Sequence, residues 1–160
     1  MRKSIKNYST AVSPNKTILE IQILLAAKGA EKIMIDYRNC KPVGITFLLK
    51  TANVDMPIKL PARIENLERV FEGLVPKGKE KEQAERTGWR NIKDWIDAQI
   101  ALIETEMVSM EEVFFPYLIT EENSTLFERY QSGVLQLNAP KEHELRTKEP
   151  LSSNNHSIDL

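Results

Sequence analysis

Apolar residues recur at helical spacing from residue 14 to residue 28. Ser13 and Pro14 form a helix start, because a serine hydroxyl caps the first turn and proline has no N–H to leave unpaired there. Gly29 is a typical helix stop. The pattern predicts an N-terminal helix that packs on a sheet through Ile18, Ile21, Leu24 and Leu25.

The period then changes to two over three consecutive stretches, which is typical of strands with one buried face. The positions predicted to share a face within each strand are Ile33, Ile35, Tyr37, Ile45, Phe47, Leu49, Val54, Met56, Ile58 and Leu60. The connections are short, so the strands are predicted to form an antiparallel meander. Pro57 cannot donate a ladder hydrogen bond, which predicts that the third strand lies at an edge of the sheet or ends early.

Helical spacing returns after Arg63 and predicts one helix before Pro76 and Gly78, and a long amphipathic helix after them. The first helix presents Ile64, Leu67, Val70, Phe71 and Leu74. The long helix is predicted from Glu80 to Met107, and its apolar arc contains Trp89, Ile92, Ile96, Ile100, Ile103 and Met107, with Trp95 beside it. Gly88 costs about 1 kcal/mol relative to alanine in a helix, so it predicts either close packing of another element or a kink.

The C-terminal part contains short elements. Ser109 and Glu112 have the spacing of a capping box and predict a short helix, 117–120 a short strand, and 124–130 a last helix. Residues 138–160 have few apolar positions and no period, which predicts a disordered tail. The whole pattern predicts an α+β fold, in which an N-terminal helix lies on a three-stranded antiparallel meander and a helical C-terminal half follows.

These elements predict a single domain over residues 1–137, with residues 1–12 as a flexible arm. The net charge of -1 and the pI of about 6.2 give no general attraction to nucleic acid or anionic membranes. The longest apolar run, residues 23–27, is far shorter than the roughly 20 residues that cross a bilayer. We expect a cytoplasmic protein that does not contact a membrane.

Residues that carry catalysis or bind metals are scarce in the predicted domain. His143 and His156 both fall in the predicted tail, and the single cysteine, Cys40, lies in a turn without a histidine to activate it. The glutamates between residues 104 and 122 do not follow the spacing of a calcium-binding loop. We therefore predict no enzyme activity, no catalytic residues, no metal and no cofactor.

A strip of cations along the long helix is the first candidate binding surface. It comprises Arg86, Arg90 and Lys93, and the loop residues Lys77 and Lys79 extend it. Such a strip suits phosphate groups and predicts contact with nucleic acid. The alternative is a solvated helix border, because acidic residues four positions away can neutralise each of the three helix cations.

An acidic and aromatic segment is the second candidate surface, formed by Glu111, Glu112, Phe114, Phe115 and Tyr117. Aromatic residues are enriched at the cores of protein interfaces, so the segment predicts a partner-binding site. The alternative is that the aromatic side chains of this segment close the hydrophobic core. The edge strand around Pro57 offers a second place for a partner.

Two helices also resemble a family of small phage, prophage and mobile-element proteins. The matching residues are Lys16, Thr17, Glu20, Ile21, Leu24, Leu25, Gly29 and Ala30 in one segment, and Gln83, Ala84, Arg86, Trp89, Arg90, Glu111, Glu112 and Phe114 in the other. The chain departs from the family where a basic continuation gives way to residues 97–101. The resemblance implies a mobile-element context in a bacterial host cell rather than a mechanism.

We therefore predict a non-enzymatic phage or mobile-element accessory protein that binds and modulates a protein machine of the host or the element. The alternative is a nucleic-acid-associated accessory protein that uses the cations of the long helix. The neutral overall charge favours the first prediction. The oligomeric state is left open.

Overall fold

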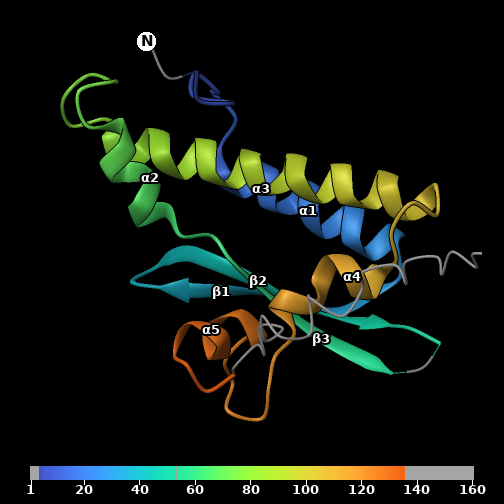
Figure 1. The fold of residues 1–160 in the computed structure, drawn as a ribbon. Helices are drawn as coiled ribbons and strands as arrows, with labels where there is room; N and C mark the ends of the chain where they lie inside the picture. The colour runs from blue at the N-terminus through green and yellow to red at the C-terminus, as the bar shows by residue number, and fades with distance from the viewer. Residues whose placement is uncertain (1–3, 53, 136–160) are drawn as a thin grey trace, which may run out of the picture.

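The computed structural model describes residues 4–52 and 54–135 (Figure 1). The elements in chain order are α1 (Pro14–Ala27), β1 (Ala30–Arg38), β2 (Lys41–Lys50), β3 (Asp55–Pro61), α2 (Ile64–Phe71), α3 (Glu80–Glu104), α4 (Met110–Phe114), the 3-10 turn η1 (Phe115–Tyr117) and α5 (Leu126–Gln131). The predicted α+β fold is confirmed. The predicted tail and both histidines lie outside the described residues.

The three strands pair antiparallel in the order β1-β2-β3, so β3 is an edge strand as Pro57 predicted. The helices α1 and α3 run side by side along one face of the sheet, and α5 lies on the opposite side (Figure 1). The face toward α1 and α3 carries Ile45, Phe47, Leu49, Met56, Ile58 and Leu60, all buried. We call the opposite side of the sheet the outer face.

Local signals in the sequence set several helix ends. The Ser13 hydroxyl accepts a hydrogen bond from the Lys16 amide at 3.3 Å, and the predicted start of α1 is confirmed. Ser109 and Glu112 form the predicted capping box of α4. Gly29 has a φ of +86°, a left-handed conformation that ends α1 at little cost for glycine.

The core lies between α1, α3 and the sheet, and Trp89 at its centre is fully buried. Gly88, the preceding residue, is the point where α2 packs against α3. A Cβ atom at Gly88 would lie 2.4 Å from Cδ1 of Ile64, which is closer than van der Waals contact allows. The predicted role of Gly88 in close packing is therefore confirmed.

Five residues of the predicted apolar faces are exposed: Tyr37, Val54, Val70, Leu74 and Met107. Val54 precedes β3, Leu74 follows the end of α2, and Val70 lies on the solvent side of α2. Tyr37 is exposed rather than buried, because a register shift between Asp36 and Tyr37 interrupts the alternation of β1. Met107 is exposed because α3 ends at Glu104 and the left-handed backbone of Glu106 turns the chain away.

Candidate functional site

The predicted cationic strip of α3 is neutralised by ion pairs. Arg86 pairs with Glu82 at 2.6 Å, and Lys93 pairs with Asp97. Arg90 pairs at 2.6 Å with Glu20 of α1, so it links two helices instead of facing solvent alone. The ion pairs therefore agree with the alternative to nucleic-acid binding, a helix border whose cations are neutralised by nearby carboxylates.

The loop before α3 adds little free positive charge. Lys79 pairs with Glu82 at 3.1 Å. The hydrogen bond and charge of Lys79, together with the charge of Arg86, lower the pKa of Glu82 below its ordinary value. Of the five cations predicted for nucleic acid, Lys77 has no ion-pair partner within the described part of the chain.

The segment predicted as a flexible arm lies against α3 over its described residues, 4–12. The Asn7 side-chain amide donates to Asn91 and to Asp94, both at 2.9 Å, and Lys6 pairs with Asp94 at 3.1 Å. Burial raises the pKa of Asp94, but the hydrogen bonds from Asn7 and Lys6 and the nearby cations outweigh burial and lower this pKa. Lys6 is thus held by a carboxylate.

The structure divides the predicted acidic and aromatic segment between core and surface. Phe114 is 1% exposed and packs edge-to-face on Phe47, with ring centroids 5.8 Å apart. Tyr117 is half-buried against Trp95. Phe115 is 58% exposed, which leaves its ring available to a partner.

The two predicted glutamates of this segment also differ. Glu112 closes the capping box of α4 by accepting from the Ser109 amide at 2.6 Å, so its role is structural. Glu111 is half-buried and has no cationic partner in the described structure. Of the five residues predicted in this segment, Phe115 and Glu111 are therefore the two whose side chains remain available to a partner.

The edge of β3 is partly covered, contrary to the prediction of an open edge around Pro57. The Ile119 amide donates to the Pro57 carbonyl at 2.8 Å, and Leu118 forms a bridge with Ile58. A strand residue directs its N–H and C=O to the same side. Since the carbonyl of Pro57 points away from β2, its missing N–H costs no ladder hydrogen bond, which explains why proline is tolerated.

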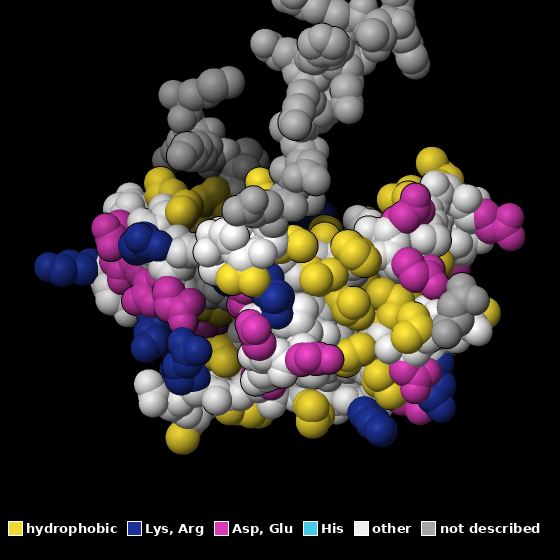
Figure 2. All heavy atoms as spheres, turned by 60° about the horizontal axis from the view of Figure 1, so that its bottom comes forward, with side chains coloured by type: hydrophobic (Ala, Val, Ile, Leu, Met, Phe, Trp, Pro, Cys, Tyr) yellow, Lys and Arg dark blue, Asp and Glu magenta, His cyan; other side chains and the backbone are white. Residues whose placement is uncertain are grey.

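The outer face of the sheet carries apolar residues at positions where alternation would place polar ones. Leu48 pairs with Pro57 on this face, and Met34 lies on the same face opposite Thr46. Met34 is 57% exposed, and Leu48 and Pro57 are half-buried. Figure 2 turns this side toward the viewer and shows hydrophobic side chains gathered across it. We give the name apolar surface to Met34, Leu48 and Pro57 together with the exposed Phe115 of η1, an element that contacts β3.

The segment from Glu104 to Glu128, which includes Phe115, is strongly acidic. It contains seven glutamates and no lysine or arginine. Within the described residues, Glu106, Glu111 and Glu121 have no cationic partner. The segment therefore places negative charge on the same part of the chain as the exposed ring of Phe115.

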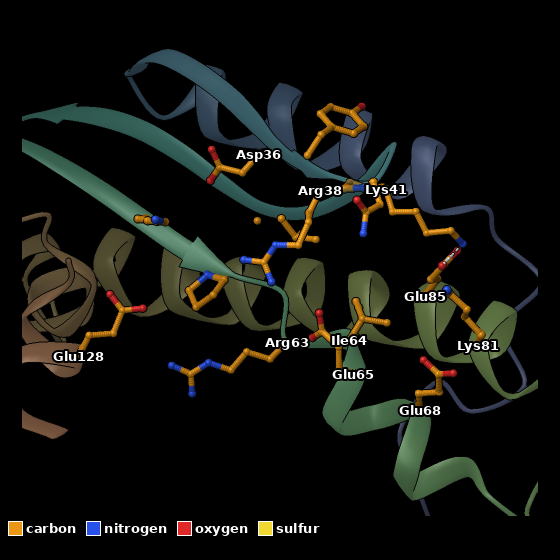
Figure 3. A pocket seen from close by; sticks show the side chains of 17 residues that line it. Asp36, Arg38, Lys41, Arg63, Ile64, Glu65, Glu68, Lys81, Glu85 and Glu128 are labelled. Carbon is orange, nitrogen blue, oxygen red and sulfur yellow. Dashed lines mark hydrogen bonds and ion pairs between the residues drawn. The ribbon is translucent and has the colours of Figure 1, made fainter. Parts of the chain in front are cut away.

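A polar cavity of about 610 Å³ opens beside the β1–β2 turn (Figure 3). Six elements and the β3–α2 link line it. Its charged residues are Asp36, Arg38, Lys41, Lys59, Arg63, Glu65, Glu68, Lys81, Glu85 and Glu128. Lys41 and Glu85 pair across it. This cavity was not predicted from the sequence, because its residues are scattered along the chain and share no motif.

The described ranges, 4–52 and 54–135, contain no cluster of His, Cys, Asp and Glu side chains that could hold a metal ion. Over the same ranges, no helix has the length and apolar character needed to cross a membrane. Cys40 is exposed in the β1–β2 turn.

The described residues form an α+β protein whose sheet carries apolar side chains on both faces. No protein-family model, curated protein or solved structure matches the chain. The resemblance to mobile-element proteins therefore stays a prediction.

Proposed function

We propose that the chain is a non-enzymatic accessory protein that binds another protein through the apolar surface. The observation that carries the proposal is the exposure of Met34 on the face that carries Leu48 and Pro57, and of Phe115 on η1, which contacts β3. Isolated apolar residues are common on protein surfaces, but neighbouring ones on adjacent strands are typical of binding sites. An antiparallel sheet that only faces water would alternate to polar residues here.

The charge around this surface defines the chemistry of the partner. The Glu104–Glu128 segment bears seven glutamates without a lysine or arginine. A partner segment with apolar side chains flanked by lysine or arginine complements both features, and opposite charge steers its approach. The resemblance of α1 and α3 to mobile-element proteins supports a search for this partner among the proteins of an element and its host.

The alternative function, nucleic-acid binding, has weaker support. Arg86, Arg90, Lys93 and Lys79 are all held by carboxylates. Binding to phosphates would break these pairs. DNA titrations over a salt series test this alternative, since an affinity carried by phosphate contacts falls steeply as salt rises.

Site-specific photo-crosslinking tests the protein-binding proposal directly. A benzophenone amino acid replaces Phe115 in one variant and Val70, an exposed apolar residue of α2, in a matched control. Both variants are irradiated in cells that carry the gene. We expect one crosslinked protein of defined mass from position 115, no such product from position 70, and loss of the product when Leu48→Asp is added. Equal products from both positions, or none from position 115, would refute the proposal.

A further inference from the structure

The cavity beside the β1–β2 turn has the dimensions of a ligand site. Its volume of about 610 Å³ lies within the range of small-molecule pockets, roughly 300–1,000 Å³. Gly44 and Pro61 line it, while Leu48 and Pro57 pair further along the strands. The cavity shares no residue with the apolar surface but adjoins it, because Lys59 of the cavity pairs with Thr46, which lies opposite Met34.

Four cations that line the cavity lack a carboxylate partner in the described structure: Arg38, Lys59, Arg63 and Lys81. Figure 3 shows Arg38 reaching from β1 toward the middle of the cavity. The guanidinium of Arg63 lies 5.5 Å from the centre of the Phe127 ring, which restrains it without neutralising its charge. Guanidinium groups bind phosphate and carboxylate oxygens in a bidentate manner, so two of them at one cavity suit an oxyanion.

The backbone of Arg63 supports this assignment. Its φ of 46° and ψ of 41° are left-handed, a conformation that favours glycine or asparagine, and its side chain does not cap α2. A strained conformation that is kept for a non-glycine residue is typical of functional sites. Arg63 lines the cavity in this conformation, and glycine would contribute no charged side chain to that lining.

The carboxylates of α2 further restrict the chemical class of the ligand. Glu65 and Glu68 line the cavity from this helix, and neither has a cationic partner in the described residues. These carboxylates would repel a second anionic group and would accept hydrogen bonds from hydroxyl or amino groups. A ligand with a single oxyanion and several donors matches both parts of the cavity.

We infer that this cavity binds a small molecule with one phosphate or carboxylate group and additional hydroxyl or amino groups, and that Arg38 and Arg63 hold the oxyanion. The probes are glucose 6-phosphate, gluconate and glutamate, with uncharged glucose as the control. Amide shifts in ¹H–¹⁵N spectra of the full chain locate binding, and calorimetry gives the Kd. We expect an anionic probe to shift the amides of residues 36–44 and 59–65, and glucose to leave them unchanged. The comparison of the sugar phosphate with the carboxylates distinguishes the two oxyanions.

Variants separate binding from folding. Arg38→Gln and Arg63→Gln each remove a charge-assisted contact and should raise the Kd about tenfold or more. Arg69→Gln, on α2 but outside the cavity lining, is the matched control and should leave the Kd unchanged. Arg63→Gly should weaken binding while it raises the melting temperature, because it relieves the left-handed strain. The inference is overturned if no anionic probe shifts these amides at millimolar concentration, or if the arginine variants bind as tightly as the wild type.

Discussion

The contact between Gly88 and Ile64 predicts that Gly88→Ala destabilises the wild-type protein but stabilises a variant with valine at position 64. In Gly88→Ala, the new methyl group would lie 2.4 Å from Cδ1 of Ile64, so the Ile64 side chain or α2 must move. Alanine gains about 1 kcal/mol over glycine in a helix interior. Overpacking costs typically about 1–3 kcal/mol. We expect Gly88→Ala to destabilise the protein by about 1 kcal/mol, because the clash outweighs the helix propensity.

Replacing Ile64 by valine removes the clashing atom. The next nearest atoms to the new methyl group are Cδ2 of Leu67 at 3.6 Å and Cγ1 of residue 64 at 3.9 Å, which are ordinary contacts. In the Ile64→Val background, Gly88→Ala should therefore stabilise the protein by about 1 kcal/mol, the helix-propensity term alone. The difference between the two backgrounds corresponds to a coupling free energy of about 2 kcal/mol, within the range found for contacting residues.

Urea unfolding followed by circular dichroism measures the wild type and the three variants, and coincident tryptophan fluorescence checks two-state behaviour. Ala98→Gly, at an exposed position of α3, is the matched control and should cost about 1 kcal/mol in either background. If Gly88→Ala has the same effect with isoleucine and with valine at position 64, the contact does not determine the packing of α2 on α3.

Three further predictions concern a turn, the core and the N-terminal segment. Cys40 has a φ of 60° in a two-residue hairpin turn that favours glycine, so Cys40→Gly should raise the unfolding free energy in urea by about 1 kcal/mol, and an unchanged value would contradict this. Phe114→Ala should destabilise the protein by about 3–5 kcal/mol and Phe115→Ala by less than about 0.5 kcal/mol, and equal losses in urea unfolding would contradict their opposite burial. Asp94 has a lowered pKa in the folded state, so its support of residues 4–12 is present above the ordinary aspartate pKa and lost as pH falls through the folded pKa. Hydrogen exchange of these residues should accelerate over that interval, and Asp94→Asn should remove the dependence.

Most of the fold could be predicted because its signals are local. Ser13, Pro14 and the Ser109 capping box act within a few residues of themselves, and the two-residue period of the strands is visible in short stretches. The position of Tyr37 could not be predicted, because the register shift beside it depends on pairing with β2. Helix periodicity placed Met107 on the apolar arc but could not predict that α3 ends before it.

The two candidate sites differ in how much signal they leave in the sequence. The apolar surface left a signal in the sequence. Leu48 and Met34 are apolar residues at positions that alternation assigns to the side of the sheet opposite Ile45 and Phe47. The cavity left no such signal, since Arg38 and Arg63 lie far apart in the sequence and line one cavity only after the sheet and α2 have formed. A surface built on a strand can therefore be inferred from periodicity, whereas a site assembled from separate elements requires the structure.

The two sites share no residue, which makes their proposals separable. Phe115 and Leu48 do not line the cavity, and Arg38 does not belong to the apolar surface. Substitutions at sites without shared contacts usually act independently. Leu48→Asp should therefore abolish crosslinking from position 115 and leave the Kd for the oxyanion probe unchanged, while Arg38→Gln should do the reverse. A variant that loses both functions while its melting temperature is unchanged would show that the sheet couples the two sites, and the partner protein and the small molecule would then be linked ligands rather than independent ones.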